Sequence, residues 1–313
     1  RVAGLFAGIG GIELGFRRAL GDRLDTALLC EVWEPAQQVL REHFTDVPLH
    51  PDIRTLSSLP GDLDVVAAGF PCTDLSQAGR MAGIRGDQSG LVVHLFKALR
   101  LVEESAGRLP WLLIENVPNM LSLDRGEAMR YLVGELDALG YRWAYRVVDS
   151  RFTGVPQRRR RVLLLASRVE DPRTVLFADD AGPIPDERLR VDAFGFYWTE
   201  GLRGLGWAQD AIPTFKGGST VGIPSQPAIW VPDAEPGKKF VMPNIEEAEA
   251  LQGFERGWTA AADEGKRNGP RWKLVGNAVT VGVAEWLARR LDQPGTFDLE
   301  SRPWAGPRSW PPA

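Results

Sequence analysis

The first two-thirds of the chain alternates short apolar runs with longer segments of helical periodicity, and few folds accommodate such an alternation. Six runs have the length and composition of buried strands: 1–6, 25–30, 64–68, 111–115, 141–148 and 161–167. Segments with apolar residues at helical spacing separate most of them: 12–20, 35–43, 90–104 and 126–139. Strands that alternate with helices are typical of βαβ units. The pattern therefore predicts an α/β domain with a parallel sheet.

The texture of the sequence changes near Glu170. From residue 172 to about 243 the chain is rich in Pro and Gly, with short aromatic or β-branched runs, which indicates a smaller, irregular, β-rich module. Helical patterns return at 245–251 and 279–291. We expect the last helix to pack back onto the first domain, so that the module is an insertion. The predicted division is 1–171 and 268–313 for the large domain and 172–267 for the module.

The composition is that of a globular chain, with 313 residues, 44% hydrophobic and 25% charged. No apolar stretch approaches the roughly 18 uncharged residues of a membrane span, and we expect no signal peptide before the first strand. We expect a cytoplasmic protein without membrane association. Two cysteines cannot build a disulfide framework, and the three histidines are scattered, so we expect no bound metal.

Charge is unevenly distributed along the chain. The net charge of −4 and the pI of about 5.6 argue by themselves against a nucleic-acid partner. However, six arginines and no acid lie in 151–168, and four bases and no acid lie in 266–273. Acidic residues gather instead in 170–192 and 246–249. Such segregation is expected where one face of a protein meets phosphates.

Cys72 follows the apolar run 63–68, within Gly69-Phe70-Pro71-Cys72. Proline fixes φ, and ligands of open α/β sheets bind at strand ends, so this thiol has the placement of a nucleophile. A buried cysteine that acts only as a small hydrophobe is the alternative interpretation.

A glycine-rich segment, Phe6-Ala7-Gly8-Ile9-Gly10-Gly11, joins the first strand to the first helix. Glycines let a ligand approach the backbone, although a tight structural turn is an equal alternative. Glu31 follows the second strand, where an acid can accept hydrogen bonds from a ribose, and Asp52 could meet an adenine amino group. Either acid alone could be a solvated surface residue. Together, at successive strand ends, they indicate an adenosine-containing cofactor.

Glu115 ends the apolar strand Trp111-Leu112-Leu113-Ile114-Glu115-Asn116. A carboxylate in such a place is costly to desolvate, so it should be paired or retain a proton. The alternative is a carboxylate that only accepts hydrogen bonds from backbone amides. Its predicted position at the same sheet edge as Cys72 favours a role in a site.

These motifs, in this order, resemble those of bacterial DNA (cytosine-5)-methyltransferases. The resemblance spans almost the whole chain, and its specificity comes from the ordered co-occurrence of the motifs. The matching segments are 6–11, Glu31, 52–53, 71–72, 115–117, 157–161, 249–254, and Arg271 with 276–279. The resemblance implies a Rossmann-like S-adenosylmethionine-dependent methyltransferase domain into which a smaller, β-rich target-recognition domain is inserted.

The resemblance implies transfer of a methyl group from S-adenosylmethionine to C5 of a cytosine flipped out of duplex DNA, with S-adenosylhomocysteine as the product. The Cys72 thiolate would add to C6 and Glu115 would contact N3 and the exocyclic amine. An ordinary thiol titrates near ~8.5, so a positive neighbour is wanted. Arg159 and Arg161 match the family's two spaced arginines, and Arg161 would also hold O2 of the base.

The remaining site residues are likewise implied by the resemblance. The cofactor-binding residues would be Phe6, Gly8, Gly10, Gly11, Glu31, Val32, Asp52, Ile53, Pro71, Leu91 and Asn277. The DNA-contacting residues would be Ser76, Gln77, Arg158, Arg160, Thr214 and Arg271. Val32 departs from the family, which often has an aromatic residue there; Trp33 is displaced by one position.

Three other functions compete with this one. An RNA cytosine methyltransferase would share the fold, but its Cys-Phe-Thr motif is absent. A DNA-binding module with decayed catalysis disagrees with the intact Cys72, Glu115 and Arg161. A nicotinamide-dependent oxidoreductase would leave Cys72 and the arginine run unexplained. We therefore expect double-stranded DNA as the partner of a bacterial enzyme, a monomer because base flipping needs only one subunit, and a restriction-modification or other phage-defence setting.

Overall fold

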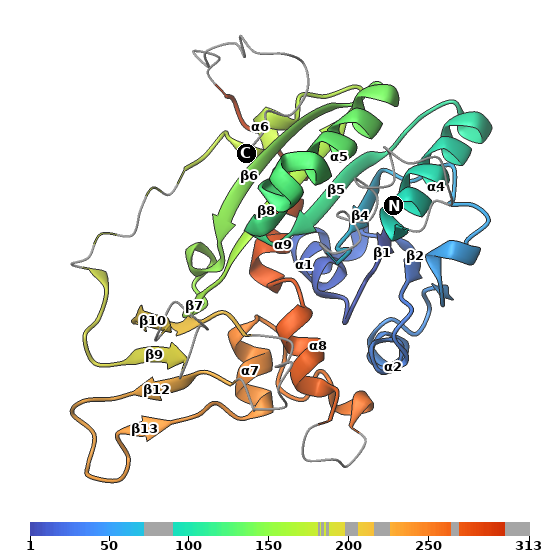
Figure 1. The fold of residues 1–313 in the computed structure, drawn as a ribbon. Helices are drawn as coiled ribbons and strands as arrows, with labels where there is room; N and C mark the ends of the chain where they lie inside the picture. The colour runs from blue at the N-terminus through green and yellow to red at the C-terminus, as the bar shows by residue number, and fades with distance from the viewer. Residues whose placement is uncertain are drawn as a thin grey trace.

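The computed structural model describes residues 1–71, 90–180, 182, 185, 188–197, 206–215, 226–263 and 269–297. Within them a seven-stranded sheet, in the order β3-β2-β1-β4-β5-β8-β6, forms the centre of the larger domain (Figure 1). Its strands are β1 (Val2–Leu5), β2 (Thr26–Cys30), β3 (Leu49–His50), β4 (Val65–Ala68), β5 (Trp111–Asn116), β6 (Arg142–Asp149) and β8 (Arg160–Ser167). Each predicted strand is present, and the short β3 was not predicted.

The strands β1 to β5 are parallel, whereas β8 runs antiparallel to both of its neighbours, β5 and β6. The expectation of a parallel sheet is therefore wrong for β8. A parallel connection needs a crossover of a dozen or more residues, usually a helix. The connection 150–159 holds no such helix, so the chain turns back from β6 and β8 fills the place between β5 and β6.

Alternate residues of the central strands supply the two faces of the sheet. On one face, Val66 and Ala68 of β4 pack with residues of α4 (Leu91–Ala106) and α5 (Glu127–Ala138). On the other, Val65 and Ala67 pack with residues of α1 (Gly11–Leu20), α6 (Pro172–Leu176) and α9 (Val281–Asp292). The sheet is thus covered on both sides, as expected for a largely parallel sheet.

The last helix returns to the first domain, which confirms that expectation. A Cβ atom on Gly15 of α1 would lie 2.5 Å from Ala284 Cβ and 2.6 Å from Val281 O, so only a glycine permits this close approach of α1 and α9. The chain therefore leaves the core of the larger domain after α6 and is part of that core again in α9.

The smaller module contains a four-stranded antiparallel sheet in the order β10-β9-β12-β13, which confirms its predicted β-rich character (Figure 1). Its strands are β9 (Phe194–Tyr197), β10 (Gly206–Gln209), β12 (Ala228–Trp230) and β13 (Phe240–Val241). The short strands β7 (Gln157–Arg158) and β11 (Ile212–Pro213) pair in parallel and join the module to the larger domain. The other α-helices of the described residues are α2 (Glu34–His43), α7 (Ile245–Leu251) and α8 (Arg271–Asn277), and short 3-10 helices lie between the elements.

Packing does not follow the predicted domain boundaries. Val175 and Leu176 of α6 belong to the core of the larger domain, and Phe254 and Trp258 pack against the residues around α2. The predicted boundary at residue 172 follows the change in composition, and composition does not show which residues pack in which core. None of the helices in the described part of the chain combines the length and apolar character of a membrane span.

Candidate active site

Several predicted site residues meet at the carboxyl ends of the parallel strands. Gly69, after β4, donates its amide to Leu5 O of β1 at 3.3 Å. A Cβ atom on Gly69 would lie 3.8 Å from both Glu115 Oε2 and Phe6 O. The glycine loop, the segment that precedes Cys72 and the end of β5 are therefore neighbours, at the edge where open α/β sheets bind ligands.

Backbone amides hold Glu31. Gly8 N donates to Oε2 and Trp33 N donates to Oε1, each at 2.8 Å. Burial raises the pKa of Glu31, and these amides oppose the rise. A carboxylate offers about four acceptor positions, so Glu31 can fix the loop and still accept hydrogen bonds from a ribose.

The three glycines of the loop have different surroundings. Gly8 has φ of +57°, and a Cβ atom there would meet nothing within 4 Å. By contrast, a Cβ atom on Gly10 would lie 2.8 Å from Phe44 Cζ, and one on Gly11 would lie 2.5 Å from Val279 O. Gly8 thus borders open space, whereas packing explains Gly10 and Gly11. Phe6 also has a positive φ, 57°, which is uncommon for a residue with a side chain.

The other predicted cofactor residues lie around this loop. Asp52 caps a short helical turn and forms an ion pair with Arg54, which lowers its pKa. Ile53 is buried, and Leu91 packs on the same core. Val32 is 58% exposed, and Pro71 and Asn277 are also exposed. Asp52 can meet an adenine only by sharing its carboxylate with Arg54.

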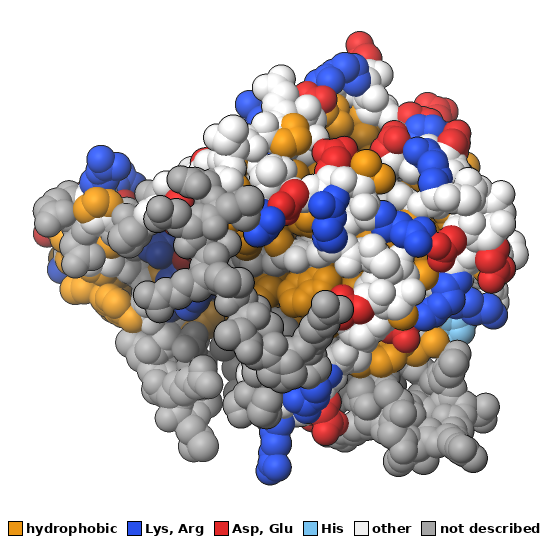
Figure 2. All heavy atoms as spheres, turned by 90° about the horizontal axis from the view of Figure 1, so that it is seen from above, with side chains coloured by type: hydrophobic (Ala, Val, Ile, Leu, Met, Phe, Trp, Pro, Cys, Tyr) orange, Lys and Arg blue, Asp and Glu red, His pale blue; other side chains and the backbone are white. Residues whose placement is uncertain are grey.

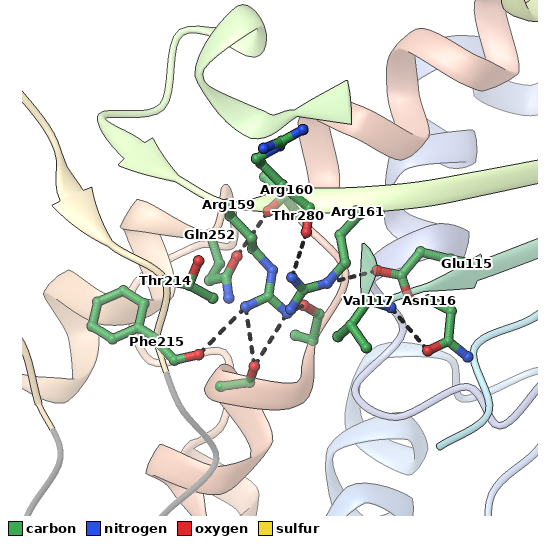
Figure 3. Close-up of polar contacts among 12 residues, drawn as sticks. Glu115, Asn116, Val117, Arg159, Arg160, Arg161, Thr214, Phe215, Gln252 and Thr280 are labelled. Atoms are coloured by element: carbon green, nitrogen blue, oxygen red, sulfur yellow. Dashed lines mark hydrogen bonds and ion pairs between the residues drawn. The ribbon is translucent and has the colours of Figure 1, made fainter. Parts of the chain in front are cut away.

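Glu115 and Arg161 form a nearly buried ion pair. Arg161 Nε lies 3.0 Å from Glu115 Oε1, and the two side chains are 13% and 9% exposed (Figure 3). The register of β5 and β8 places Glu115 opposite Leu163, so Arg161 leaves the same face of the sheet. Burial raises the pKa of Glu115, while Arg161 opposes the rise. The expected pairing of Glu115 is confirmed.

Asn116 fixes the segment that leads to Cys72. Its Nδ2 donates to Phe70 O at 2.9 Å, and its Oδ1 accepts from Val117 N at 2.8 Å. The rings of Phe6 and Phe70 meet edge to face, 5.9 Å apart. Cys72, Ser76 and Gln77 themselves lie outside the described residues.

Arg159 is fully buried and points away from Glu115, toward backbone carbonyls (Figure 3). Its guanidinium donates to Gly276 O at 3.1 Å and to Ala278 O at 2.6 Å, at the end of α8. Burial lowers its pKa, and Arg161 adds to that effect. A cation is favourable beside the last carbonyls of a helix. The structure therefore gives Arg159 a bracing contact, and its predicted catalytic role stays a prediction.

The predicted DNA-binding residues have unlike surroundings. Arg160 is exposed and points away from Arg159 and Arg161 (Figure 3). Arg158 O accepts from Thr214 Oγ1 at 2.8 Å. Arg271 is 14% exposed and forms an ion pair with Glu249. On the face in Figure 2, basic and acidic side chains are intermixed, so the segregation along the sequence is not apparent there.

Gln252 lies in the matching segment 249–254, and the sequence alone predicts no role for it. Its Nε2 donates to Val275 O at 2.8 Å. Its Oε1 accepts from Thr280 Oγ1, also at 2.8 Å (Figure 3). It thus joins the ends of α7, α8 and α9. A buried amide of this kind has no signature in a single sequence, because its partners come from distant segments.

Comparisons with known proteins agree with the geometry. The family model described as C-5 cytosine-specific DNA methylase matches residues 1–200. The Type II methyltransferase M2.BsuMI of Bacillus subtilis (strain 168) is 48% identical, over 100% of this chain and 80% of that protein. M.MspI of Moraxella sp is 25% identical, over 92% of this chain and 69% of that protein.

Solved structures share the fold. The S. pombe Dnmt2 methyltransferase matches with a TM-score of 0.64 and 17% identity, over 93% of this chain and 98% of that one. Entamoeba histolytica EhMeth matches with a TM-score of 0.63 and 16% identity, over the same shares. The predicted methyltransferase fold is confirmed. On the family match and the full-length relative together, the chain belongs to the C-5 cytosine-specific DNA methylases and is a DNA (cytosine-5)-methyltransferase.

Proposed function

We propose that this enzyme methylates C5 of a flipped-out cytosine in a specific duplex DNA sequence through a covalent bond between Cys72 and C6. The observation that carries the proposal is the convergence of three features at one sheet edge. These are the Gly8–Glu31 contact, the Phe70 segment that leads to Cys72, and the buried pair of Glu115 and Arg161.

The residues around the glycine loop would hold S-adenosylmethionine. When bound, it supplies an electrophilic methyl group and leaves as S-adenosylhomocysteine. Glu31 would accept hydrogen bonds from the ribose, and the open side of Gly8 allows close approach to the backbone. Ile53 and Leu91 would line the adenine pocket.

Cys72 would activate the base. Its thiolate Sγ forms a bond to C6, and the electrons of the C5–C6 double bond move to C4–C5. The electrons of the N3–C4 double bond move onto N3, which takes a proton from Glu115. C5 then has the electron pair that receives the methyl group, and N3 returns its proton to Glu115. A base from solvent removes the C5 proton, whose electron pair restores the C5–C6 double bond as the Sγ–C6 bond breaks and the thiolate leaves.

The surroundings of Glu115 support this role. An acid works best when its pKa lies near the operating pH, and burial raises the pKa of Glu115. Arg161 would keep the carboxyl in place and contact O2 of the cytosine. Since C5 is inaccessible inside a duplex, the base must be flipped out, at a cost of a few kcal/mol. Arg160 and the module would grip the DNA, and the Type II names of the relatives support a restriction-modification setting.

The test is incubation with labelled S-adenosylmethionine and mixed-sequence duplex DNA, with a tRNA pool in parallel, followed by mass analysis of the nucleosides. We expect 5-methylcytosine in DNA alone, and none from Cys72→Ser, which should still bind S-adenosylhomocysteine. Label in tRNA would overturn the choice of substrate, and normal turnover by Cys72→Ser would overturn the covalent mechanism.

A further inference from the structure

Trp258 reaches the glycine loop from the far end of the chain. Its indole Nε1 donates to Ile9 O at 2.9 Å, across 249 positions of sequence. The side chain is buried, and so is this hydrogen bond. Ile9 stands between Gly8, whose amide bonds Glu31, and Gly10. The indole thus holds a carbonyl in the middle of the loop.

Two residues at the end of α2 fix the other side of Trp258. The His43 ring stacks on the indole with centroids 3.5 Å apart and planes 3° apart, and His43 Nε2 donates to Trp258 O at 2.8 Å. Phe44 meets the indole edge to face at 6.4 Å, and it also lies against Gly10. The end of α2 therefore contacts both the glycine loop and the indole.

The neighbours of Trp258 in sequence are held by Glu249, which is buried. Gly257 N donates to Glu249 Oε2 at 2.6 Å, and Thr259 N donates to Oε1 at 2.9 Å. Arg271 completes the set with a 3.1 Å ion pair to Oε1. The residues before and after Trp258 are therefore both fixed, which keeps the indole N–H in place.

The loop itself needs outside support. Phe6, Gly8 and Gly10 all have φ in the left-handed region, at 57°, 57° and 80°. Backbone in sparsely populated conformations persists only when its surroundings hold it. The carbonyl of Ile9 lies within this run, so the indole hydrogen bond acts on the part of the loop that is hardest to keep in place.

We propose that Trp258 is a positioning residue for the methyl-donor site: its N–H holds the Phe6–Gly11 loop in the conformation in which Gly8 can approach the donor. The inference rests on the proposed role of this loop in binding S-adenosylmethionine. It acts through the loop and not through the DNA or the reacting atoms. Binding of the donor should therefore change while the chemistry does not.

The test is Trp258→Phe, which removes the donor and keeps an aromatic ring against His43 and Phe44. We expect the Kd for S-adenosylhomocysteine, measured by calorimetry, to rise about fivefold, the usual weight of one hydrogen bond. The KM for S-adenosylmethionine should rise equally, with kcat and the KM for DNA within twofold of the wild type. The matched control is Trp286→Phe, whose indole meets Phe152 and not the loop, and which should change neither constant.

His43→Gln provides a second variant if Trp258→Phe does not fold. It removes the stacked ring but keeps a donor for Trp258 O, and a smaller rise in the same Kd is expected. Wild-type Kd in Trp258→Phe, or unchanged Kd in His43→Gln where the first variant is unfolded, would overturn the inference. So would an equal loss of donor and DNA affinity. Failure of the wild type to bind S-adenosylhomocysteine would instead overturn the proposed function.

Discussion

Two carboxylates at the same edge of the sheet are satisfied in different ways. Glu31, after β2, is held by neutral backbone amides that the fold keeps in place. Glu115, at the end of β5, is held by the guanidinium of Arg161. Burial raises the pKa of both. The amides suit the proposed role of Glu31 as a permanent acceptor for a ligand's hydroxyls. Arg161 suits the proposed role of Glu115 as a proton donor, because it stabilises the carboxylate that remains after the proton has left.

A third carboxyl, Glu13 of α1, has no cationic partner among the described residues, and only its own backbone amide opposes the effect of burial on its pKa. It is buried, its Oε2 meets no hydrogen-bond partner among the described residues, and burial raises its pKa to about 7. A Cβ atom on Gly4 of β1 would lie 2.9 Å from Glu13 Cδ. The Glu13 side chain therefore fits only because residue 4 is a glycine. Each of the following variants replaces one of these three carboxyl groups and so tests the effect of its surroundings.

The largest effect is expected for Glu115→Gln. An amide cannot deliver the proton to N3, so kcat should fall by about 10²- to 10⁴-fold, the usual weight of a general acid. The Kd for S-adenosylhomocysteine should stay within twofold of the wild type. Single-turnover kinetics on substrate DNA would measure the first quantity and calorimetry the second. A Glu115→Gln enzyme with wild-type kcat would contradict the proposal that Glu115, unlike Glu31, transfers a proton.

Glu13→Gln should change stability and not activity. The pKa of Glu13 is raised from 4.5 to about 7 on folding, so the folded state binds more protons between these values. The unfolding free energy of the wild type should therefore decrease by up to about 3 kcal/mol as pH rises from 4.5 to 7. The variant should lack this decrease. Urea unfolding at pH 5 and pH 8 measures it, and parallel profiles of the two proteins would contradict the assignment.

Glu31→Gln should weaken the binding of S-adenosylhomocysteine by about 10- to 100-fold, because hydrogen bonds to a charged acceptor contribute about 1.5–3 kcal/mol. At saturating donor, kcat should change little. Calorimetry with the wild type as reference gives the ratio. A loss confined to kcat would contradict the proposal that Glu31 binds the methyl donor and takes no part in the chemical step.

Counted per pH unit, the smallest effect is expected from pH. Because burial raises the pKa of Glu115, its protonated form persists to higher pH than that of an ordinary carboxyl, and it is lost as pH rises through the raised value. Above that value kcat should fall by at most about tenfold per pH unit. Glu115→Gln should lack this decrease. A profile from pH 5 to 9 at saturating substrates compares the two enzymes.

Local patterns predicted the parts of this site that one segment determines. The strands, the glycine loop, Glu31 and the pairing of Glu115 all follow from apolar runs that end in polar residues. The reversed direction of β8 depends on the short connection before it. The packing roles of Gly10 and Gly11 depend on Phe44 and Val279, which are distant in sequence. Such contacts leave no mark in any one segment, because they exist only once the chain has folded.

The run of arginines from Arg158 to Arg161 shows most clearly that contacts between distant segments cannot be predicted from one segment. Arg159 and Arg161 are two positions apart and look equivalent in sequence, but one meets the carbonyls at the end of α8 and the other meets Glu115. The difference arises because Arg161 lies within β8, next to Val162, which pairs with Asn116 of β5, whereas Arg159 precedes that strand.

The return of α9 to α1 also has a consequence for synthesis. One face of the central sheet is covered in part by α9, through Val283 and Leu287, and α9 leaves the ribosome only after the whole inserted module. At about 5–20 residues per second, the part of that face that α9 covers stays open for several seconds or more after α6 has been made. Nascent chains of this enzyme therefore pass through a stage at which an apolar sheet surface is open to chaperones and to other chains.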